Sequence, residues 1–234
     1  YLASRIAEFY ERAGEVQCLG KDERTGTLTV IGAVSPAGGD ISEPVSQSSL
    51  RIVKVFWGLD AALAAKRHFP SINWLTSYSL YKEQAEKWAR ENISEEFVEL
   101  KNRAMAILQE ESKLQEIVQL VGIDAVSPKD RVTLEVARLL REDYLAQDAF
   151  DDVDCYASSH KQERIIKLIF KFYEQIEHAV NNGVNIEEYI KLPYVSRIGK
   201  AKFIEESKVD FEFDDIEKAL VKETNTIIEK GGLA

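Results

Sequence analysis

The sequence is poor in cysteine, methionine and proline. It contains 2 cysteines, 1 methionine and 5 prolines among 234 residues. Cys18 and Cys155 lie far apart and match no spacing of a metal site or a redox pair, so we expect two free thiols in a reducing compartment. No stretch of about 18 consecutive apolar residues occurs, which excludes a membrane-spanning helix.

Positive charge is also in short supply. Lys and Arg together number 30 against 40 Asp and Glu, which gives a formal net charge of −10. Nucleic acids and anionic membranes are bound through clusters of basic side chains. The acidic balance therefore argues against both as direct partners.

The motifs of a complete active site are missing as well. A phosphate-binding loop reads GxxxxGK followed by serine or threonine. Gly199 and Lys200 lack the upstream glycine, and the glycines at 32–39 have no lysine after them. The GxSxG elbow of serine hydrolases is absent too. The histidines lie too far apart to suggest a zinc site, and each is predicted to be at the surface or half-buried: His68, His160 and His178. We therefore predict no catalytic residue and no metal ligand in this chain.

The start of the chain is unusual. It opens with Tyr1 rather than methionine, and residues 2–13 already have the apolar spacing of a helix. No charged segment followed by an apolar run is present, which excludes a signal peptide. We expect the chain to begin inside a folded element and to be a piece of a longer protein.

Residues 1–80 mix strand and helix signals. Runs rich in β-branched residues predict strands at 15–19, 27–34 and 52–56, the last of them buried. We expect a polar turn at 21–26, a loop at 35–40 and a short alanine-rich helix at 60–68. Strand, helix and strand in this order predict part of an α/β domain.

Residues 81–234 have a helical pattern almost throughout. Apolar residues at helical spacing over 104–121 end at Gly122. A new helix is predicted to start at Ser127 and Pro128, because serine caps free N–H groups, proline suits the first helical position, and Asp130 favours the positive helix end. Further helices are predicted over 165–180 and 214–230. An all-α bundle is therefore expected to follow the α/β segment.

Two stretches carry residues with more than one interpretation. Gly38 and Gly39 precede Asp40, Ser42 and Glu43. This stretch is either a capped turn that leads into a helix or an acidic loop that grips a moving or basic partner.

The second stretch places Phe69 between a short helix and Pro70. The ring either fills the core or stands at the rim of a pocket, where it presents a flat face to a planar ligand.

Several long motifs in the right order make the chain resemble one family. They are GAVSPAGGDISEPV at 32–45, LRIVKVFWGLD at 50–60, RHFPSINWLTSYSLY at 67–81, LQEIV at 114–118 and REDYLAQDAF at 141–150. They resemble the catalytic A subunit of V-type and archaeal-type rotary ATPases over nearly the whole chain, more weakly after residue 184. The resemblance implies a RecA-like nucleotide-binding domain ending near residue 80, followed by a helical domain.

The resemblance also implies site residues. In this family the adenine of the nucleotide sits between aromatic rings, and the matching positions are Phe69 and Phe150. Stacking and apolar burial would suit a flat base there. Contacts with the central stalk are implied for Asp40, Ser42 and Glu43.

The turn at 124–130 matches the position of the acidic helix-turn-helix lever in the related F-type β subunit. The resemblance implies stalk contacts for Ser127, Lys129 and Asp130. This turn is less acidic than that lever, because Ala125 and Val126 lie within it.

The activity that the resemblance implies is ATP hydrolysis or synthesis coupled to proton or sodium transport. ATP or ADP with Mg would be the cofactors, but their phosphate and Mg ligands are expected outside this chain, so the chain alone is predicted to be inactive. The implied partners are the B subunits of the A3B3 ring, one of which supplies an arginine, and the central stalk. The implied location is cytoplasmic, peripheral to the membrane in the soluble V1/A1 sector.

Two other hypotheses remain open. The chain could belong to a non-catalytic regulatory subunit that keeps the adenine pocket without chemistry. It could also be a helical scaffold in which Phe69 and Phe150 only fill the core.

Overall fold

The computed structural model describes residues 1–20 and 23–231, which group into two compact units. Unit 1 comprises residues 1–57 and 77–81. Unit 2 comprises residues 58–76 and the chain from Lys82 onward. The segment 58–76 therefore groups with the helices that follow it, although the sequence predicts a domain boundary at 80/81.

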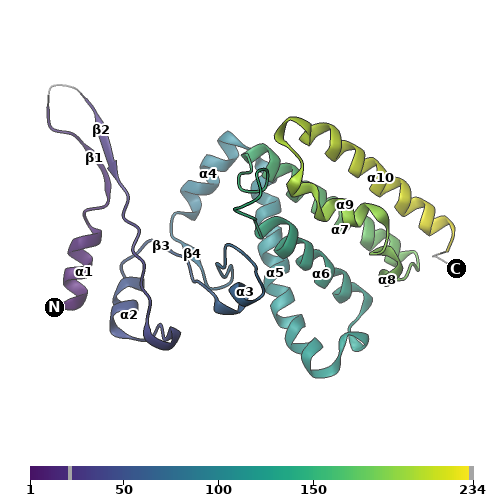
Figure 1. Cartoon of the computed structure of the whole chain (residues 1–234), viewed down its shortest axis with the longest axis horizontal. Coiled ribbons are helices and arrows are strands. Elements are labelled where there is room, and N and C mark those ends of the chain that lie inside the picture. Colours follow the sequence, from purple (N-terminus) through teal and green to yellow (C-terminus); the bar gives the residue numbers. More distant parts are fainter. Residues whose placement is uncertain (21–22, 232–234) are drawn as a thin grey trace. The chain divides into compact units, whose positions relative to one another are not determined.

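Unit 1 begins with helix α1 (Leu2–Tyr10) and an antiparallel hairpin of β1 (Gly14–Gln17) and β2 (Thr25–Leu28) (Figure 1). The predicted strands 15–19 and 27–34 are thus present but shorter and shifted. The hairpin has only two strands, so residues 29–34 have no neighbour in it to pair with and leave the strand conformation. Of the predicted turn at 21–26, Lys21 and Asp22 lie outside the described residues.

The second half of unit 1 contains helix α2 (Pro44–Leu50), which packs against α1. Strand β3 (Val55–Phe56) then pairs antiparallel with β4 (Tyr78–Ser79). The prediction of a buried strand at 52–56 is wrong, because only two of these residues are strand and Val55 is 40% exposed. Its single partner strand is equally short, so the apolar run has no sheet to be buried in.

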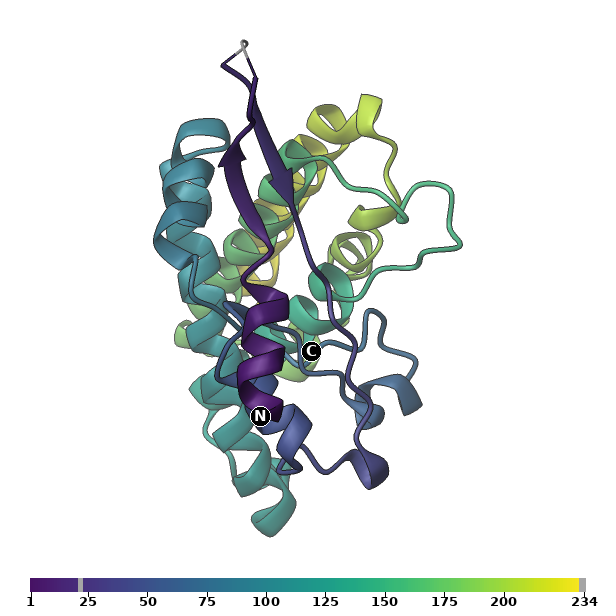
Figure 2. The same ribbon diagram turned by 90° about the vertical axis from the view of Figure 1, so that its left-hand side faces the viewer.

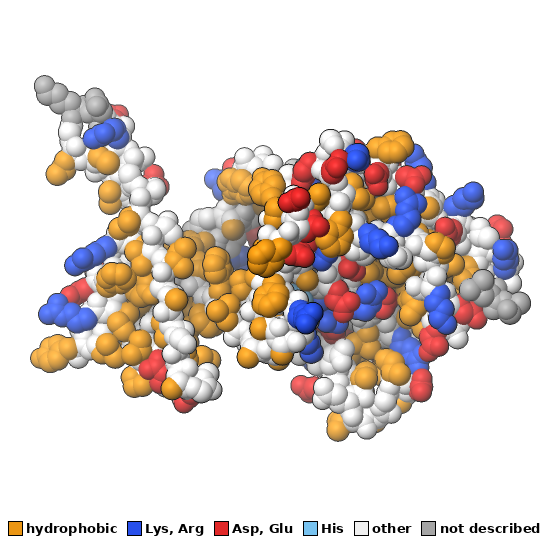
Figure 3. All heavy atoms as spheres, viewed as in Figure 1, with side chains coloured by type: hydrophobic (Ala, Val, Ile, Leu, Met, Phe, Trp, Pro, Cys, Tyr) orange, Lys and Arg blue, Asp and Glu red, His pale blue; other side chains and the backbone are white. Residues whose placement is uncertain are grey.

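Unit 1 leaves most of its apolar side chains uncovered. Among its described residues, the buried ones are Ser46 and Ser49, and no hydrophobic side chain is buried. Figure 3 shows hydrophobic side chains spread over the surface of this unit. The exposed large ones include Leu2, Phe9, Val16, Leu28, Ile31, Val34 and Ile41. Unit 1 therefore presents much apolar surface that its own described residues do not cover.

Unit 2 is helical and holds the hydrophobic core (Figures 1 and 2). It opens with the segment 58–76, which contains helix α3 (Ala61–Ala65). The other helices are α4 (Lys82–Asn92), α5 (Glu95–Val121), α6 (Pro128–Leu139), α7 (Ser159–Asn181), α8 (Ile186–Tyr189), α9 (Pro193–Gly199) and α10 (Val209–Glu229).

Helix α7 is the centre of this core, because it contacts α5, α6 and α10. Its apolar stripe is fully or almost fully buried at Ile165, Leu168, Ile169, Phe172 and Ile176. The predicted helix over 165–180 is confirmed, and it begins six residues earlier at Ser159. Within the described ranges, no helix combines the length and apolar character that crossing a membrane requires.

The predicted helix boundaries between α5 and α6 are confirmed. Gly122 ends α5 with a φ of 83°, in the left-handed region that glycine adopts without steric cost. Ser127 begins α6, and its Oγ accepts a hydrogen bond from the amide of Asp130 at 3.2 Å. Pro128 occupies the first helical turn.

Candidate functional site

The Phe69 loop is built by hydrogen bonds that close the segment 58–76 on itself. The amide of Asp60 donates to the carbonyl of Ser71 at 2.8 Å, and the amide of Asn73 donates to the carbonyl of Gly58 at 2.8 Å. The Asp60 carboxylate caps α3 through the Ala62 amide at 2.7 Å and accepts from Nδ2 of Asn73 at 2.9 Å. The bond from Asn73, followed by that from Ala62, lowers the pKa of Asp60.

The turn between α3 and Phe69 has an uncommon backbone. Arg67 has a φ of 58°, a region that residues other than glycine rarely occupy. The chain then presents Phe69 at the surface with 52% of its area exposed. A ring this exposed does not fill the core.

A π-helical turn, Leu140–Leu145, continues α6 and holds the Phe69 loop. The carbonyl of Arg141 accepts from the Ala146 amide at 3.0 Å and lies 2.9 Å from Nε2 of His68. Because a carbonyl only accepts, the proton of the half-buried His68 ring resides on Nε2. His68 thus ties the loop to the end of α6, as a positioning group rather than a metal ligand.

The loop that follows the π-helical turn carries Phe150. The Phe150 amide donates to Oδ1 of Asp148 at 2.9 Å, and the Asp148 amide donates to Oδ2 of Asp154 at 2.7 Å. Asp151 accepts from the amides of Val153 and Asp154 at 2.9 and 2.8 Å. The backbone is therefore fastened at several points, while the Phe150 ring is 99% exposed.

One hydrogen bond joins the two loops. The amide of Gln147 donates to the carbonyl of Phe69 at 2.7 Å. Both loops belong to unit 2, so the two positions assigned to adenine contact lie on one compact unit. Neither ring is in the core, which contradicts the scaffold hypothesis in which both are core residues. Exposed aromatic rings on adjoining loops suit contact with a flat, partly apolar ligand.

The acidic loop of unit 1 is a capped turn that leads into a helix. Gly38 and Gly39 have φ of 66° and 73°. Oδ1 of Asp40 accepts from the amide and the hydroxyl of Ser42 at 2.9 and 2.6 Å. Glu43 caps α2 through the amides of Val45 and Ser46.

Both carboxylates of this loop hold their charge. The hydrogen bond from the Ser42 hydroxyl lowers the pKa of Asp40, and bonding to Ser46 lowers that of Glu43. Asp40 and Ser42 are exposed and Glu43 is half-buried, so the loop presents two ionised carboxylates at the surface, that of Glu43 in part covered.

Both acidic residues of the turn at 124–130 have partners in the turn or directly after it. Arg131 lies 3.0 Å from Oδ1 of Asp124 and donates to the carbonyl of Ile123 at 3.1 Å. Ser127 also donates to Oδ2 of Asp130 at 2.7 Å. The capping residues Ser127 and Asp130 are therefore engaged with each other, whereas the side chain of Lys129 is exposed.

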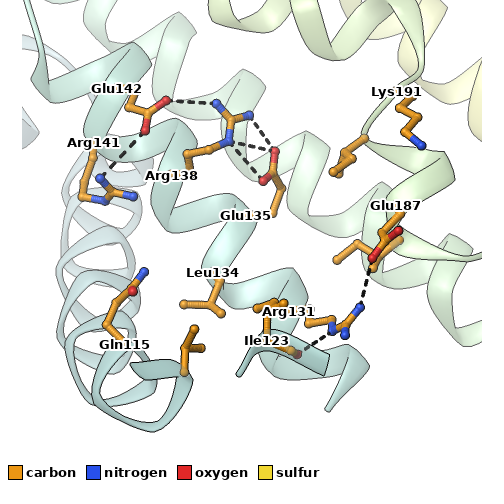
Figure 4. Close-up of a pocket in the computed structure, with 13 residues that line it drawn as sticks. Gln115, Ile123, Arg131, Leu134, Glu135, Arg138, Arg141, Glu142, Glu187 and Lys191 are labelled. Atoms are coloured by element: carbon orange, nitrogen blue, oxygen red, sulfur yellow. Dashed lines mark hydrogen bonds and ion pairs between the residues drawn. The ribbon is translucent and has the colours of Figure 1, made fainter. Parts of the chain in front are cut away.

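A hollow of about 540 Å³ lies beside this turn, lined by residues of α5, α6 and α8 (Figure 4). Its arginines already have acidic partners. Arg131 is 3.5 Å from Glu187, and Arg138 is 2.6 Å from Glu135 and 3.2 Å from Glu142. A phosphate would have to displace these carboxylates, so the hollow is not a phosphate cradle.

No cluster of potential metal ligands occurs among residues 1–20 and 23–231. His160 is exposed and lies 2.8 Å from Asp210, and His178 is exposed as well. The candidate residues of unit 2 thus lie on the two aromatic loops and the turn at 124–130, and those of unit 1 lie on its acidic loop.

Each of the two units matches a known protein family. Residues 1–79 match the ATP synthase alpha/beta family, nucleotide-binding domain, and residues 86–190 match the C-terminal domain of V and A type ATP synthase. The V-type ATP synthase alpha chain of Clostridioides difficile (strain 630) is 57% identical over 232 residues, which cover 99% of this chain and 39% of that protein. The chain belongs to the family of V-type ATP synthase alpha chains.

Other members of this family are similarly close. V-type ATP synthase alpha chain 1 of Clostridium tetani is 56% identical over 233 residues, or 100% of this chain. The alpha chain of Acetivibrio thermocellus is 56% identical over 230 residues, or 98% of this chain. The chain spans 39% of the length of each of these relatives.

A solved structure supports the fold. The structure of a unique ATP synthase subunit NeqB from Nanoarcheaum equitans superposes with a TM-score of 0.59 at 24% identity, over 74% of this chain and 39% of that one. The predicted family is therefore confirmed, and so is the fold class of a nucleotide-binding α/β segment followed by a helical region.

The sequence did not point to the residues that fasten the two loops. Arg141 and Gln147 act through their backbone, which any residue type supplies. The buried Asp154 and the largely covered Lys202 are polar residues that the sequence does not distinguish from its other acids and lysines. A signal existed only at His68, next to the aromatic position.

Proposed function

We propose that this chain is the part of a V-type ATP synthase alpha chain that holds the adenine of ATP or ADP and contacts the central stalk. In the complete subunit, ATP hydrolysis or synthesis is coupled to proton or sodium transport. The observation that carries the proposal is the pair of exposed rings, Phe69 and Phe150, on loops joined by the bond from Gln147 to Phe69.

The phosphates and the Mg ion of the nucleotide are held by residues outside this chain. The sequence contains no phosphate-binding loop, and phosphoryl transfer depends on such a loop and on Mg. The chain alone is therefore proposed to bind ATP weakly and not to hydrolyse it. Phosphate release measured with the isolated chain, Mg and ATP should equal the rate without protein, and turnover above that rate would contradict this part of the proposal.

The partners are the B subunits of the A3B3 ring and the central stalk. The uncovered apolar side chains of unit 1 support contact with further protein. The stalk contacts are proposed for Asp40, Ser42 and Glu43, and for Ser127, Lys129 and Asp130. The complex places the chain on the cytoplasmic side, peripheral to the membrane.

The adenine contact is tested with Phe69→Ala and Phe150→Ala in the complete alpha chain. Loss of a stacking ring should weaken MgADP binding by about tenfold, measured by calorimetry. Because both rings are exposed, urea unfolding should change little. Phe211→Ala is the matched control, since this ring is 80% exposed on α10. Unchanged MgADP affinity in both loop variants, or an equal effect of Phe211→Ala, would refute the pocket.

The regulatory-subunit alternative is less favoured, because the relatives that match over nearly the whole chain are named alpha chains. A complete subunit that lacks the lysine of the phosphate-binding loop would restore that alternative.

A further inference from the structure

We propose that Lys202 is a positioning residue that fixes the Phe150 loop for adenine recognition. This inference rests on the proposed function. Lys202 lies beyond residues 86–190, the part of the helical unit that matches the family of C-terminal domains. It belongs to a short turn between α9 and α10, and only 14% of its side chain is exposed.

The ammonium group of Lys202 joins both ends of the loop. Nζ donates to the carbonyl of Glu142 at 3.1 Å and to the carbonyl of Ala146 at 3.0 Å. It also lies 3.8 Å from Oδ2 of Asp154. An ammonium has three donors and no acceptor, so two carbonyls and a carboxylate are the surroundings that it needs when buried.

Asp154 connects Lys202 to the backbone that carries the Phe150 ring. Its side chain is 5% exposed, and the oxygen that faces Lys202 also accepts the amide of Asp148 at 2.7 Å. Asp148 in turn accepts the amide of Phe150 at 2.9 Å. An unbroken series of contacts therefore runs from Lys202 through Asp154 and Asp148 to Phe150.

The ammonium group of Lys202 also positions the Phe150 loop relative to the loop that carries Phe69. Ala146 directly precedes Gln147, whose amide donates to the carbonyl of Phe69. Fixing the Ala146 carbonyl therefore fixes the point at which the two loops meet. Without Lys202, the buried carboxylate of Asp154 loses its nearest cation and the Ala146 carbonyl loses a donor, so the loop should sample more conformations.

The test uses the complete alpha chain with Lys202→Met, Lys202→Arg and the control Lys200→Met, an exposed lysine two residues earlier. Affinity is measured for MgADP and for inorganic tripolyphosphate, which has no base. Lys202→Met should weaken MgADP by roughly threefold to tenfold, the range of mutations that act through a contact network. Affinity for tripolyphosphate should stay the same, Lys202→Arg should retain most of the MgADP affinity, and Lys200→Met should change neither.

Amide hydrogen exchange gives a second readout. Lys202→Met should lose protection at Gln147 and Asp148, whose amides make the two bonds that place the loop. If Lys202→Met does not fold, Asp154→Asn replaces it, because it keeps an acceptor for the Asp148 amide and removes the charge. Unchanged MgADP affinity in Asp154→Asn would then overturn the inference.

The outcomes separate this inference from the proposed function. If Phe150→Ala weakens MgADP and Lys202→Met does not, the pocket stands and the role of Lys202 is refuted. Equal losses for MgADP and tripolyphosphate in Lys202→Met would make Lys202 a general structural residue and would also refute it. If Phe150→Ala alone leaves MgADP affinity unchanged, the role of Lys202 is refuted, and if Phe69→Ala leaves it unchanged as well, both proposals fall.

Discussion

Nε of Arg141 lies 3.0 and 3.1 Å from the two carboxylate oxygens of Glu111. Glu111 is 5% exposed on α5, and the carbonyl of the same Arg141 accepts a hydrogen bond from Nε2 of His68. This pair thus connects the core of unit 2 with the loop that carries Phe69.

Replacing Glu111 with alanine should strongly destabilise unit 2. Removing one partner of a buried ion pair leaves the other charge uncompensated, which costs about 3–5 kcal/mol, and the partial exposure of Arg141 favours the lower end. Urea unfolding measures the change. Glu110→Ala is the control, because Glu110 is the exposed neighbour on the same helix. Equal unfolding free energies for the two variants would show that the pair contributes nothing.

Ser127→Ala should lower the free energy of unfolding by about 1 kcal/mol, because α6 loses its N-cap. Ser127→Asp should retain most of the stability, since aspartate also caps helices. Chemical denaturation of the three proteins measures this order. The same pair of variants separates capping from stalk contact. A stalk affinity that falls in Ser127→Asp, where the cap is kept, would assign the serine hydroxyl to the stalk.

Asp143 should make the stability of unit 2 depend on pH. Burial raises the pKa of Asp143 from 3.8 to about 6, with the charges of Arg138 and Lys202 opposing the shift. Between pH 3.8 and 6 the folded state therefore binds more protons than the unfolded state, and this group's contribution to stability falls as pH rises through that window. Below pH 3.8 the stabilising contribution of protonated Asp143 is fully present, and above about pH 6 it is lost.

Asp143→Asn removes this titration. The difference in unfolding free energy between the variant and the unmodified chain should move in favour of the variant from pH 4 to pH 7.5. We expect this change to be up to about 2 kcal/mol, after allowance for the partial exposure of Asp143. Urea unfolding at both pH values gives the difference, with the exposed Asp152→Asn as the control. A difference between Asp143→Asn and the unmodified chain that does not change with pH would contradict the assignment.

The carboxylates of Asp40 and Glu43 should attract the central stalk. In the complete alpha chain, Asp40→Asn combined with Glu43→Gln should weaken stalk binding at low salt, and the difference should shrink as salt screens the charges. Both substitutions keep side-chain acceptors for the amides that the two residues cap. Glu15→Gln, an exposed carboxylate on β1, is the control. If the double variant binds the stalk as tightly as the unmodified subunit at low salt, the proposed contact is wrong.

The sequence predicted what short-range chemistry determines. The boundaries of α5 and α6 could be predicted because Gly122, Ser127 and Pro128 act on the backbone next to them. The buried face of α7 could be predicted because helical spacing places Ile165, Leu168 and Phe172 on one side. The family could be recognised because its long motifs lie in order along the chain.

Only the tertiary structure decided the features that depend on distant partners. The apolar run around Val55 looks like a buried strand, yet its burial requires neighbouring strands that are not present among the described residues of unit 1. The spacing around Phe69 favoured a core position over the rim of a pocket, yet Phe69 lies at the surface, on a loop held by contacts with Arg141 and Gln147. These contacts use backbone atoms, which are the same in every residue. A carbonyl becomes a binding partner only when the fold brings a donor such as Lys202 to it, and no local sequence pattern encodes that approach.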